Sequence, residues 1–368
     1  MITKPAQLLA LVDQAKSADA IALDTEFFWE HTYYPRLGLI QLAISGDECH
    51  LIDPLALDDL RPVGELLAHP GLVKIFHDAG QDLAILQRAT GATAQNVFDT
   101  RLAAGFASLP STLSLAVLVR ELLGTDLIKT ETRSDWLHRP LSAEQLAYAD
   151  NDVRYLHALR LSILRRITKP QVKAWLYEEL ALYNDPRSYI SDGSSRYQRL
   201  RAALSLPPAG AAILKRLFIW REETARASDK PRGHIIPDAG LLAIAHRPPE
   251  GIAELYSLGL SNQAITRHGG AIIALCAETS GIPEETAAPV EKPWRLSASE
   301  KESYRRLRDM IRLKSEMLGI DPGLIGNSDE LRAVARFLLA DGAFPAASLR
   351  QLSGWRMTFL KDFHPGRA

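Results

Sequence analysis

"IALDTEFFWE", residues 21–30, reads as a buried β-strand that carries two acids. Side chains alternate across a strand, so Asp24 and Glu26 lie on one face, about 6.5 Å apart along the chain. Two carboxylates in a poorly solvated place raise each other's pKa unless a cation is supplied. The stretch therefore predicts either a strand end that is hydrated by solvent or a site in which both acids hold a cation.

The whole chain has the length and composition of a globular protein with two or three domains, with 368 residues of which 46 % are hydrophobic. No apolar run reaches the roughly 18 residues that a transmembrane helix needs. The segment 5–15, "PAQLLALVDQA", predicts a first helix rather than a signal peptide. The two cysteines, Cys49 and Cys276, form no disulfide or zinc pattern, which favours a reducing, cytoplasmic setting.

Charge is distributed unevenly along the chain, although the net charge is only −1. Up to Asn184 there are 17 Lys and Arg against 23 Asp and Glu, and the remainder has 26 against 21. This asymmetry fits a front half that gathers metal cations and a back half that meets polyanions.

The first hundred residues alternate between strand and helix patterns. Strands are predicted at 20–27, 38–45, 49–54, 73–77 and 96–100, and helices at 81–89 and from Ser142 onward. This alternation predicts a mixed α/β sheet with helices packed on it. After Asn184 the strand signal fades: 184–199 reads as a polar connector, 283–294 as a Pro- and Glu-rich linker, and the rest as helical.

The helix that begins at Ser142 carries a second group of polar residues. Ser142 and Gln145 form a capping box, and Leu146, Ala149, Val153, Leu156 and Ile163 mark the buried face of one continuous helix. Because Tyr148 and Asp152 are four residues apart, they stack on one another at the border of that face. The pattern presents an acid and a phenol together at the edge of the core.

A third acid lies in "VKIFHDAGQDLAIL", residues 73–86. A strand ends near His77, and Asp78 with Gln81 predicts a helix cap. Asp82 then falls in the first helical turn, where the helix dipole favours a carboxylate.

Strand ends and the starts of the following helices are where α/β sheets build their sites, so these four acids are expected to converge. Two divalent cations would neutralise four carboxylates, and hard oxygen ligands favour Mg²⁺ or Mn²⁺ over zinc. Two such ions clamp the attacking and leaving oxygens of a phosphodiester. The expected site consists of Asp24, Glu26, Asp82 and Asp152.

Three motifs in order, "LDTEF", "FHDAGQDLAIL" and "YADNDVRYL", resemble the ribonuclease D group of DEDDy 3′→5′ exonucleases. The stretches "FDTRLAA" (98–104) and "KTETRSDWLHRPL" (129–141) are also similar to that family, and "LFIWREETARASDKPRGHIIPD" resembles its HRDC domain. The resemblance implies that Asp24, Glu26, Asp82 and Asp152 hold two Mg²⁺ or Mn²⁺ ions. It also implies that Tyr148, the family's tyrosine, orients the nucleophilic water or accepts its proton, with orientation and partial proton acceptance as the expected role.

The fold implied by the resemblance is α/β, an RNase H-like exonuclease domain with a mixed sheet followed by two small all-α HRDC-type domains. The expected boundaries are an exonuclease domain at 1–170, a connector at 171–206, an HRDC domain at 207–284, a linker at 285–294 and a second HRDC-like domain at 295–368.

The resemblance further implies a cytoplasmic exoribonuclease that trims RNA with a single-stranded 3′ end, such as pre-tRNA, and releases 5′ mononucleotides. It implies no membrane and no obligate protein partner. Phe27 is a candidate for stacking on bases, and His77 and Lys129 are candidate phosphate contacts. Two alternatives remain open at this point: a DNA 3′→5′ exonuclease, and a non-catalytic RNA-binding protein that has kept the fold.

Overall fold

The computed structural model describes residues 1–127, 134–190, 193, 196–198, 200, 206–279, 296–339 and 349–364. The chain forms two compact units. The first unit contains residues 1–27, 37–190 and 296–368, and the second contains residues 28–36 together with 191–295. One segment of the N-terminal region therefore belongs to the second unit.

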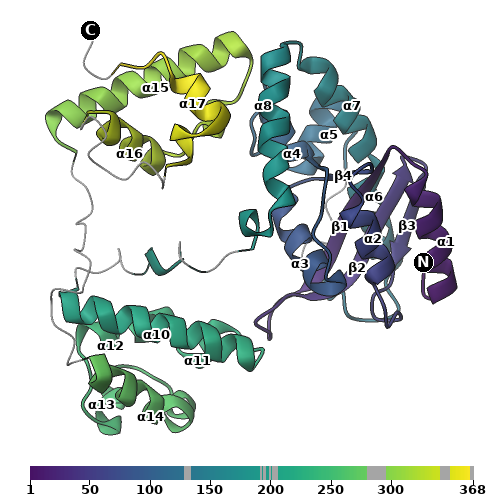
Figure 1. The fold of residues 1–368 in the computed structure, drawn as a ribbon. Helices are drawn as coiled ribbons and strands as arrows, with labels where there is room; N and C mark the ends of the chain where they lie inside the picture. Colours follow the sequence, from purple (N-terminus) through teal and green to yellow (C-terminus); the bar gives the residue numbers. More distant parts are fainter. Residues whose placement is uncertain are drawn as a thin grey trace. The chain divides into compact units, whose positions relative to one another are not determined.

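A five-stranded mixed sheet forms the centre of the first unit, as the sequence predicts (Figure 1). Its order is β3 (Glu48–Ile52), β2 (Arg36–Ser45), β1 (Ala20–Phe28), β4 (Val73–Phe76) and β5 (Val97–Asp99). Strand β1 is parallel to β4, and β4 is parallel to β5. Strands β2 and β3 are antiparallel to each other.

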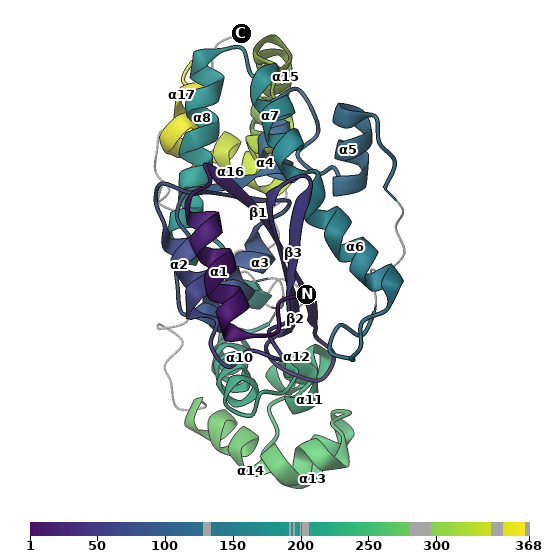
Figure 2. The ribbon, with the colours of Figure 1, turned by 90° about the vertical axis from the view of Figure 1, so that its right-hand side faces the viewer.

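Helices cover both faces of this sheet (Figures 1 and 2). On one face, Ile21 and Leu23 of β1 share a core with α1 (Pro5–Lys16), α2 (Arg61–Ala68) and α3 (Gly80–Thr90). On the other, Ala20 and Ala22 share a core with α4 (Thr100–Gly105), α5 (Leu115–Leu123), α7 (Leu156–Arg166) and α8 (Pro170–Leu180). Because side chains alternate, Asp24 and Glu26 continue the face of Ala20 and Ala22.

The sequence predicts a single helix from Ser142 onward. This prediction is wrong in one respect, because the structure contains two helices there. Helix α6 (Ala143–Arg154) begins with the expected capping box, and α7 starts again after Tyr155. Ala149 of α6 packs in a small cluster with Trp136, whereas Leu156 of α7 lies in the main core. Val153, near the end of α6, also lies in the main core, so α6 contacts both clusters and α7 continues in the main core.

The C-terminal helices belong to the first unit and share a hydrophobic core with the rest of it. It contains α15 (Ala298–Leu318), α16 (Ser328–Leu339) and α17 (Gly354–Leu360), with short 3₁₀ turns at Pro322–Leu324 and Arg350–Leu352. The Trp355 ring stacks on Trp175 of α8, with centroids 5.4 Å apart, and meets Phe106 edge-on at 5.3 Å. This helical module therefore folds onto the sheet-containing part of the chain.

A buried ion pair joins α17 to α8. Arg356 and Glu179 are 5 % and 7 % exposed, and the guanidinium donates to both carboxylate oxygens at 2.6 and 2.8 Å. Trp355 Nε1 donates to the same carboxylate at 2.6 Å, and Arg356 Nε donates to the Leu324 carbonyl at 2.9 Å. These hydrogen bonds replace the hydration that Glu179 loses on burial. Burial alone would raise the pKa of Glu179, but the Arg356 guanidinium outweighs this effect and lowers it.

Substituting Arg356 by Met is expected to lower the free energy of unfolding by about 3 kcal/mol, because Glu179 stays buried without its cation. Urea unfolding of the full chain at neutral pH measures this. Arg305→Met is the matched control, since the Arg305–Glu302 pair is exposed and its loss is expected to change the free energy of unfolding far less. Equal effects of the two substitutions would contradict the assignment.

The second unit is helical. It contains α10 (Pro208–Ala227), α11 (Arg232–Ile235), α12 (Asp238–His246), α13 (Ile252–Ser257) and α14 (Asn262–Thr279). Its core gathers apolar residues from all five helices and also Tyr33 from the segment that follows β1. The helical pattern predicted for this part of the sequence is confirmed.

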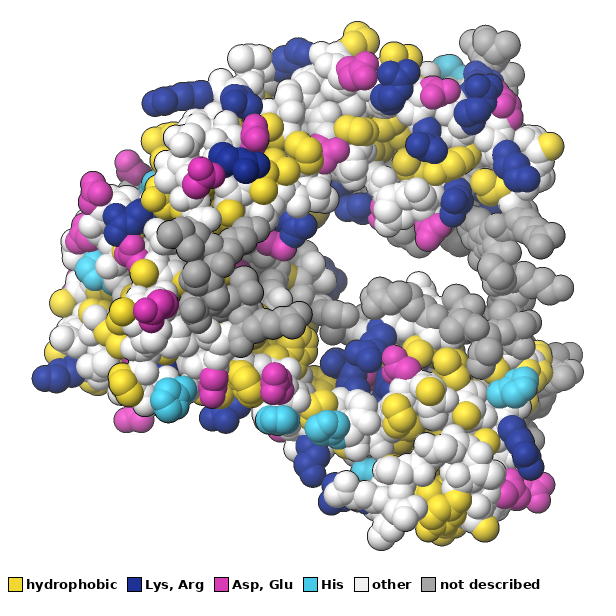
Figure 3. Space-filling view, turned by 180° about the vertical axis from the view of Figure 1, so that it is seen from behind, with side chains coloured by type: hydrophobic (Ala, Val, Ile, Leu, Met, Phe, Trp, Pro, Cys, Tyr) yellow, Lys and Arg dark blue, Asp and Glu magenta, His cyan; other side chains and the backbone are white. Residues whose placement is uncertain are grey.

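Two surface properties complete the description. None of the helices formed by the described residues is long and apolar enough to cross a bilayer. Basic and acidic side chains occur side by side on the face in Figure 3. The basic excess of the later sequence is therefore not gathered into one continuous patch on that face.

Two short 3₁₀ turns, Ala181–Asn184 and Pro186–Ser188, follow α8 in the first unit.

Candidate active site

Three of the predicted acids meet at one place in the first unit. Asp24 and Glu26 come from β1 and Asp152 from α6, and each offers a carboxylate oxygen within 4.8 Å of the others. The i, i+2 spacing on β1 puts Asp24 and Glu26 on the same face, as predicted. The last full turn of α6 brings Asp152 to them.

Asp82 approaches the same cluster from α3. It lies in the first turn of that helix, as predicted, and is 7 % exposed. Thr25, between the two acids of β1, donates its hydroxyl to Asp82 Oδ1. The negative charge of Asp82 contributes to raising the pKa values of both Asp24 and Glu26. The four acids are therefore electrostatically coupled.

The start of α3 is held by Asp99 instead of by the predicted cap. The expected Asp78–Gln81 cap is wrong: α3 begins at Gly80 without a side-chain cap, and Asp78 has a left-handed φ of 68°. Asp99 accepts hydrogen bonds from the backbone N–H groups of Asp78 and Ala79 at 3.1 and 3.0 Å. Asp99 thereby fixes the turn that leads into Asp82.

Tyr148 lies one helical turn before Asp152. Burial raises the pKa of Asp152, and the nearby Tyr148 hydroxyl offsets part of this rise. The Trp136 ring packs against Tyr148, with centroids 6.1 Å apart. Arg139 holds the Trp136 loop in place, because its Nε and Nη2 donate to the two Asp53 oxygens at 2.8 and 2.7 Å. Gly38 permits this packing, since a Cβ there would lie 2.6 Å from the Trp136 carbonyl oxygen.

The carboxylates are poorly compensated by the protein alone. Burial, with the neighbouring acids, raises the pKa of Glu26 to about 9 and that of Asp24 well above its ordinary value. Burial is also the main cause that raises the pKa values of Asp82 and Asp152 to about 7. Full ionisation of the cluster near neutral pH therefore calls for cations.

The donor set fits a divalent metal ion. All the converging ligands are carboxylate oxygens, which hard cations such as Mg²⁺ prefer. Asp152 Oδ2 is buried and has no hydrogen-bond partner among the described residues. Such an orphaned oxygen is what a coordinating ion would satisfy.

The metal-free protein is expected to lose stability as the pH rises. Glu26, Asp82 and Asp152 have raised pKa values when folded, so their contribution is present below about pH 4 and disappears as pH passes through about 7 to 9. Each such group costs about 1.4 kcal/mol per pH unit between its unfolded and folded pKa values.

Thermal unfolding in EDTA between pH 5 and 9 tests this dependence. Asp152→Asn is expected to flatten the profile relative to the wild type, and added Mg²⁺ is expected to restore stability at the alkaline end. Parallel profiles for the two proteins in EDTA would contradict the raised pKa.

The three residues predicted to contact the substrate differ in their surroundings. Phe27 is half-buried near the end of β1. His77 uses both ring nitrogens within the fold, with Nδ1 2.9 Å from Thr100 Oγ1 and Nε2 3.2 Å from the Leu113 carbonyl oxygen. Lys129 lies outside the described residues.

Sequence reasoning missed three supporting residues, Thr25, Asp99 and Trp136. Thr25 stands between the two motif acids, and Asp99 occupies a typical N-cap position before α4, where it accepts from the Arg101 and Leu102 N–H groups. The alternation of side chains along β1 was the signal available for Thr25, and the capping pattern before α4 was the signal available for Asp99. Trp136 carries no local signal, because its partner Tyr148 is distant in sequence.

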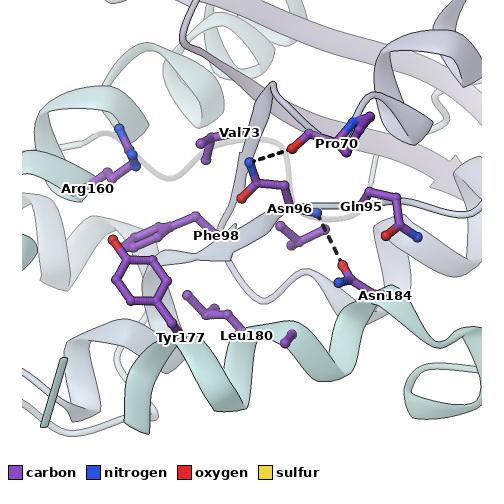
Figure 4. Close-up of a pocket in the computed structure, with 11 residues that line it drawn as sticks. Pro70, Val73, Gln95, Asn96, Phe98, Arg160, Tyr177, Leu180 and Asn184 are labelled. Atoms are coloured by element: carbon purple, nitrogen blue, oxygen red, sulfur yellow. Dashed lines mark hydrogen bonds between the residues drawn. The ribbon is translucent and has the colours of Figure 1, made fainter. Parts of the chain in front are cut away.

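A separate pocket of about 230 Å³ lies at the opposite end of the parallel strands (Figure 4). Val73 at the start of β4 and Asn96 just before β5 line it, together with Tyr177 of α8. Asp82, in contrast, follows the other end of β4. This pocket contains none of the four acids and is not the metal site.

Comparison with known proteins identifies the class to which this chain belongs. A family model described as 3′-5′ exonuclease matches residues 1–168, and a model of the HRDC domain matches residues 210–276. The fold, the acidic cluster and these matches together define a 3′→5′ exonuclease with an attached HRDC domain.

Similarity to curated relatives extends over nearly the whole chain. Ribonuclease D of Desulfotalea psychrophila is 46 % identical over 366 residues, covering 99 % of this chain and 97 % of the relative. Ribonuclease D of Xanthomonas oryzae pv. oryzae is 35 % identical, covering 98 % and 96 %. The crystal structure of Escherichia coli RNase D has a TM-score of 0.82 at 28 % identity and covers 99 % of both chains. The chain belongs to the ribonuclease D family and is a 3′→5′ exoribonuclease.

Proposed function

We propose that this exoribonuclease trims the 3′ ends of tRNA precursors and other structured RNAs, releasing 5′ mononucleotides in the cytoplasm. The convergence of Asp24, Glu26 and Asp152 within 4.8 Å is the observation that supports hydrolysis at this site. The E. coli relative is described as an exoribonuclease involved in structured RNA processing, which supports this substrate class. The chain has only two cysteines, Cys49 and Cys276, which is compatible with a reducing compartment.

In the proposed mechanism, Asp24, Glu26, Asp82 and Asp152 would hold the ions, with Asp82 on the side of the second ion. Two Mg²⁺ or Mn²⁺ ions, when bound, supply the positive charge that stabilises the attacking and leaving oxygens of the phosphodiester. Thr25 orients Asp82 through its hydroxyl. Asp99 fixes the backbone turn before it.

Tyr148 orients the attacking water in this proposal. Burial, followed by the nearby acids, raises the pKa of its phenol above the ordinary value, so the hydroxyl keeps its proton at neutral pH. A protonated phenol donates a hydrogen bond and fixes the position of a water molecule. This role requires no transfer of a proton to Tyr148.

The proposed substrate contacts and domains follow the family resemblance. Phe27, His77 and Lys129 are proposed to contact the 3′-terminal nucleotides. The helical parts are proposed to be an HRDC domain at 207–284 and a diverged second copy at 295–368, with the exonuclease domain at 1–170. The HRDC match at 210–276 supports the first of these helical domains.

End-labelled pre-tRNA, incubated with and without Mg²⁺ or Mn²⁺, tests the proposal directly. We expect stepwise shortening from the 3′ end and 5′ mononucleotides as products, only in the presence of metal. A pre-tRNA that stays intact while unstructured RNA is degraded would contradict the proposed substrate. Release of oligonucleotides would contradict the exonucleolytic product.

A further inference from the structure

The segment 28–36 between β1 and β2 is part of the helical unit. Tyr33, near its middle, is 6 % exposed and lies in the core of that unit. Its hydroxyl donates to Glu222 Oε2 at 3.0 Å and accepts from Arg226 and Arg232 at 3.3 and 2.9 Å. The phenol therefore has a full set of hydrogen-bond partners, all from the helical unit.

The backbone of the segment is fixed as well. Asp229 Oδ1 accepts hydrogen bonds from the N–H groups of Tyr33 and Tyr34 at 3.1 and 3.3 Å. Asp229 itself has a φ of 46°, in the left-handed region, which aims its carboxylate at this backbone. The Arg232 guanidinium lies 4.3 Å from the centre of the Tyr33 ring, within cation–π range. The segment thus follows one defined course.

Trp29 is the aromatic residue of this segment that stays exposed. It is 50 % exposed, whereas Phe28 and Tyr34 are half-buried. The indole Nε1 donates to the Tyr33 carbonyl at 3.1 Å, so the buried Tyr33 also sets the orientation of the indole. A ring fixed in this way offers a stacking face at little cost in side-chain entropy.

A pocket of about 230 Å³ lies beside this indole. Arg196, Pro231 and Arg232 line it together with Trp29 and Glu30. The volume is below the range of roughly 300 to 1,000 Å³ that is typical of sites for drug-sized ligands, and suits one nucleobase.

Arg196 retains the capacity to bind an anion at this pocket. It lies 3.5 Å from Asp238, whose other oxygen already accepts from Arg221 at 2.7 Å. Its side chain is 38 % exposed. Glu30, on the same pocket, is 68 % exposed and opposes an incoming phosphate.

We propose that this pocket binds one nucleotide of a single-stranded RNA, with the base stacked on the Trp29 indole and a phosphate oxygen bound by Arg196. Stacking on an indole accepts any base, which suits an enzyme that removes successive nucleotides. Trp29 follows Glu26 by three residues in the sequence. The proposal rests on the proposed function, which makes RNA the substrate.

Fluorescence anisotropy with a labelled single-stranded RNA oligomer measures the binding, using the full chain with Asp24→Asn to prevent cleavage. Trp29→Ala is expected to raise Kd about tenfold, because stacking of one base contributes about 1–3 kcal/mol. Trp29→Phe is expected to retain most of the affinity. Arg196→Ala is expected to weaken binding and to reduce the salt slope by about one, and Glu30→Gln to strengthen binding.

Tyr256→Ala is the matched control, since Tyr256 is 53 % exposed on α13 of the same unit and lies outside the pocket. An equal loss with this variant, or an unchanged Kd with both Trp29→Ala and Arg196→Ala, would overturn the proposal. In the active enzyme, Trp29→Ala is expected to raise KM for the oligomer, whereas Tyr256→Ala is expected to leave it unchanged.

An unchanged KM with Trp29→Ala would contradict a contact between the indole and the substrate and would overturn the proposal. Failure of the proposed function is distinguishable from this outcome. In that case the wild type leaves pre-tRNA intact, while the binding assay still reports on the pocket.

Discussion

Asp24→Asn is expected to reduce kcat/KM on RNA by more than about 10³-fold, equivalent to about 4 kcal/mol of transition-state stabilisation. Asp24 is the acid whose pKa is raised by all three of the other acids, Asp82, Asp152 and Glu26, in addition to burial. It is therefore the member of the cluster in electrostatic contact with every other ligand. Removing its charge weakens both of the proposed ion positions.

Loss of activity in this variant is expected to accompany a gain in metal-free stability. Because burial disfavours the ionised carboxylate, an amide at position 24 removes an unfavourable buried charge. The Tm of Asp24→Asn in EDTA near pH 8 should therefore exceed that of the wild type. A variant that is more stable and inactive cannot owe its inactivity to unfolding.

Asp150→Asn is the matched control for this substitution. Asp150 lies on α6 close to Asp152 in sequence but pairs with Arg154, with Oδ2 2.8 Å from Arg154 Nε. We expect kcat/KM within about twofold of the wild type, as for a surface charge pair. If Asp24→Asn also retained wild-type turnover with saturating metal, the acid cluster would not be the catalytic site.

The positions of the site residues could be predicted from the sequence wherever the repeat of a strand or a helix determines the direction in which a side chain points. Alternation along β1 places Asp24 and Glu26 on one face, and the capping box at Ser142 sets the start of α6, which fixes the register of Tyr148 and Asp152. These local rules also predicted the five strands of the sheet, with ends that differ by one or two residues.

The features that were not predictable depend on contacts between distant parts of the chain. The break at Tyr155 has neither Gly nor Pro to mark it, although Val153 before it and Leu156 after it lie in the same core. The expected cap at Asp78 is replaced by Asp99, which comes from the next strand. Likewise, no local pattern indicates that Tyr33 is buried among helices almost two hundred residues further on.

Tyr148→Phe is expected to lower kcat on the order of 10³-fold while leaving metal affinity and RNA affinity unchanged. The substitution removes one hydroxyl and keeps the ring that packs against Trp136. Calorimetric titration with Mg²⁺ and anisotropy with labelled RNA measure the two affinities, and single-turnover cleavage measures the chemical step. Tyr155→Phe is the matched control, since Tyr155 lies at the break between α6 and α7, where we expect near-normal turnover.

The pH dependence of kcat distinguishes an orienting role of Tyr148 from that of a general base. A base must lose its proton before it acts, so its rate profile would rise with pH until the phenol ionises. Burial and the neighbouring acids raise the pKa of Tyr148 above its ordinary value, so the phenol stays protonated throughout the accessible range. We therefore expect the profiles of the wild type and Tyr148→Phe to have the same shape and to differ only in height. A limb that is present in the wild type and absent in the variant would instead assign proton transfer to Tyr148.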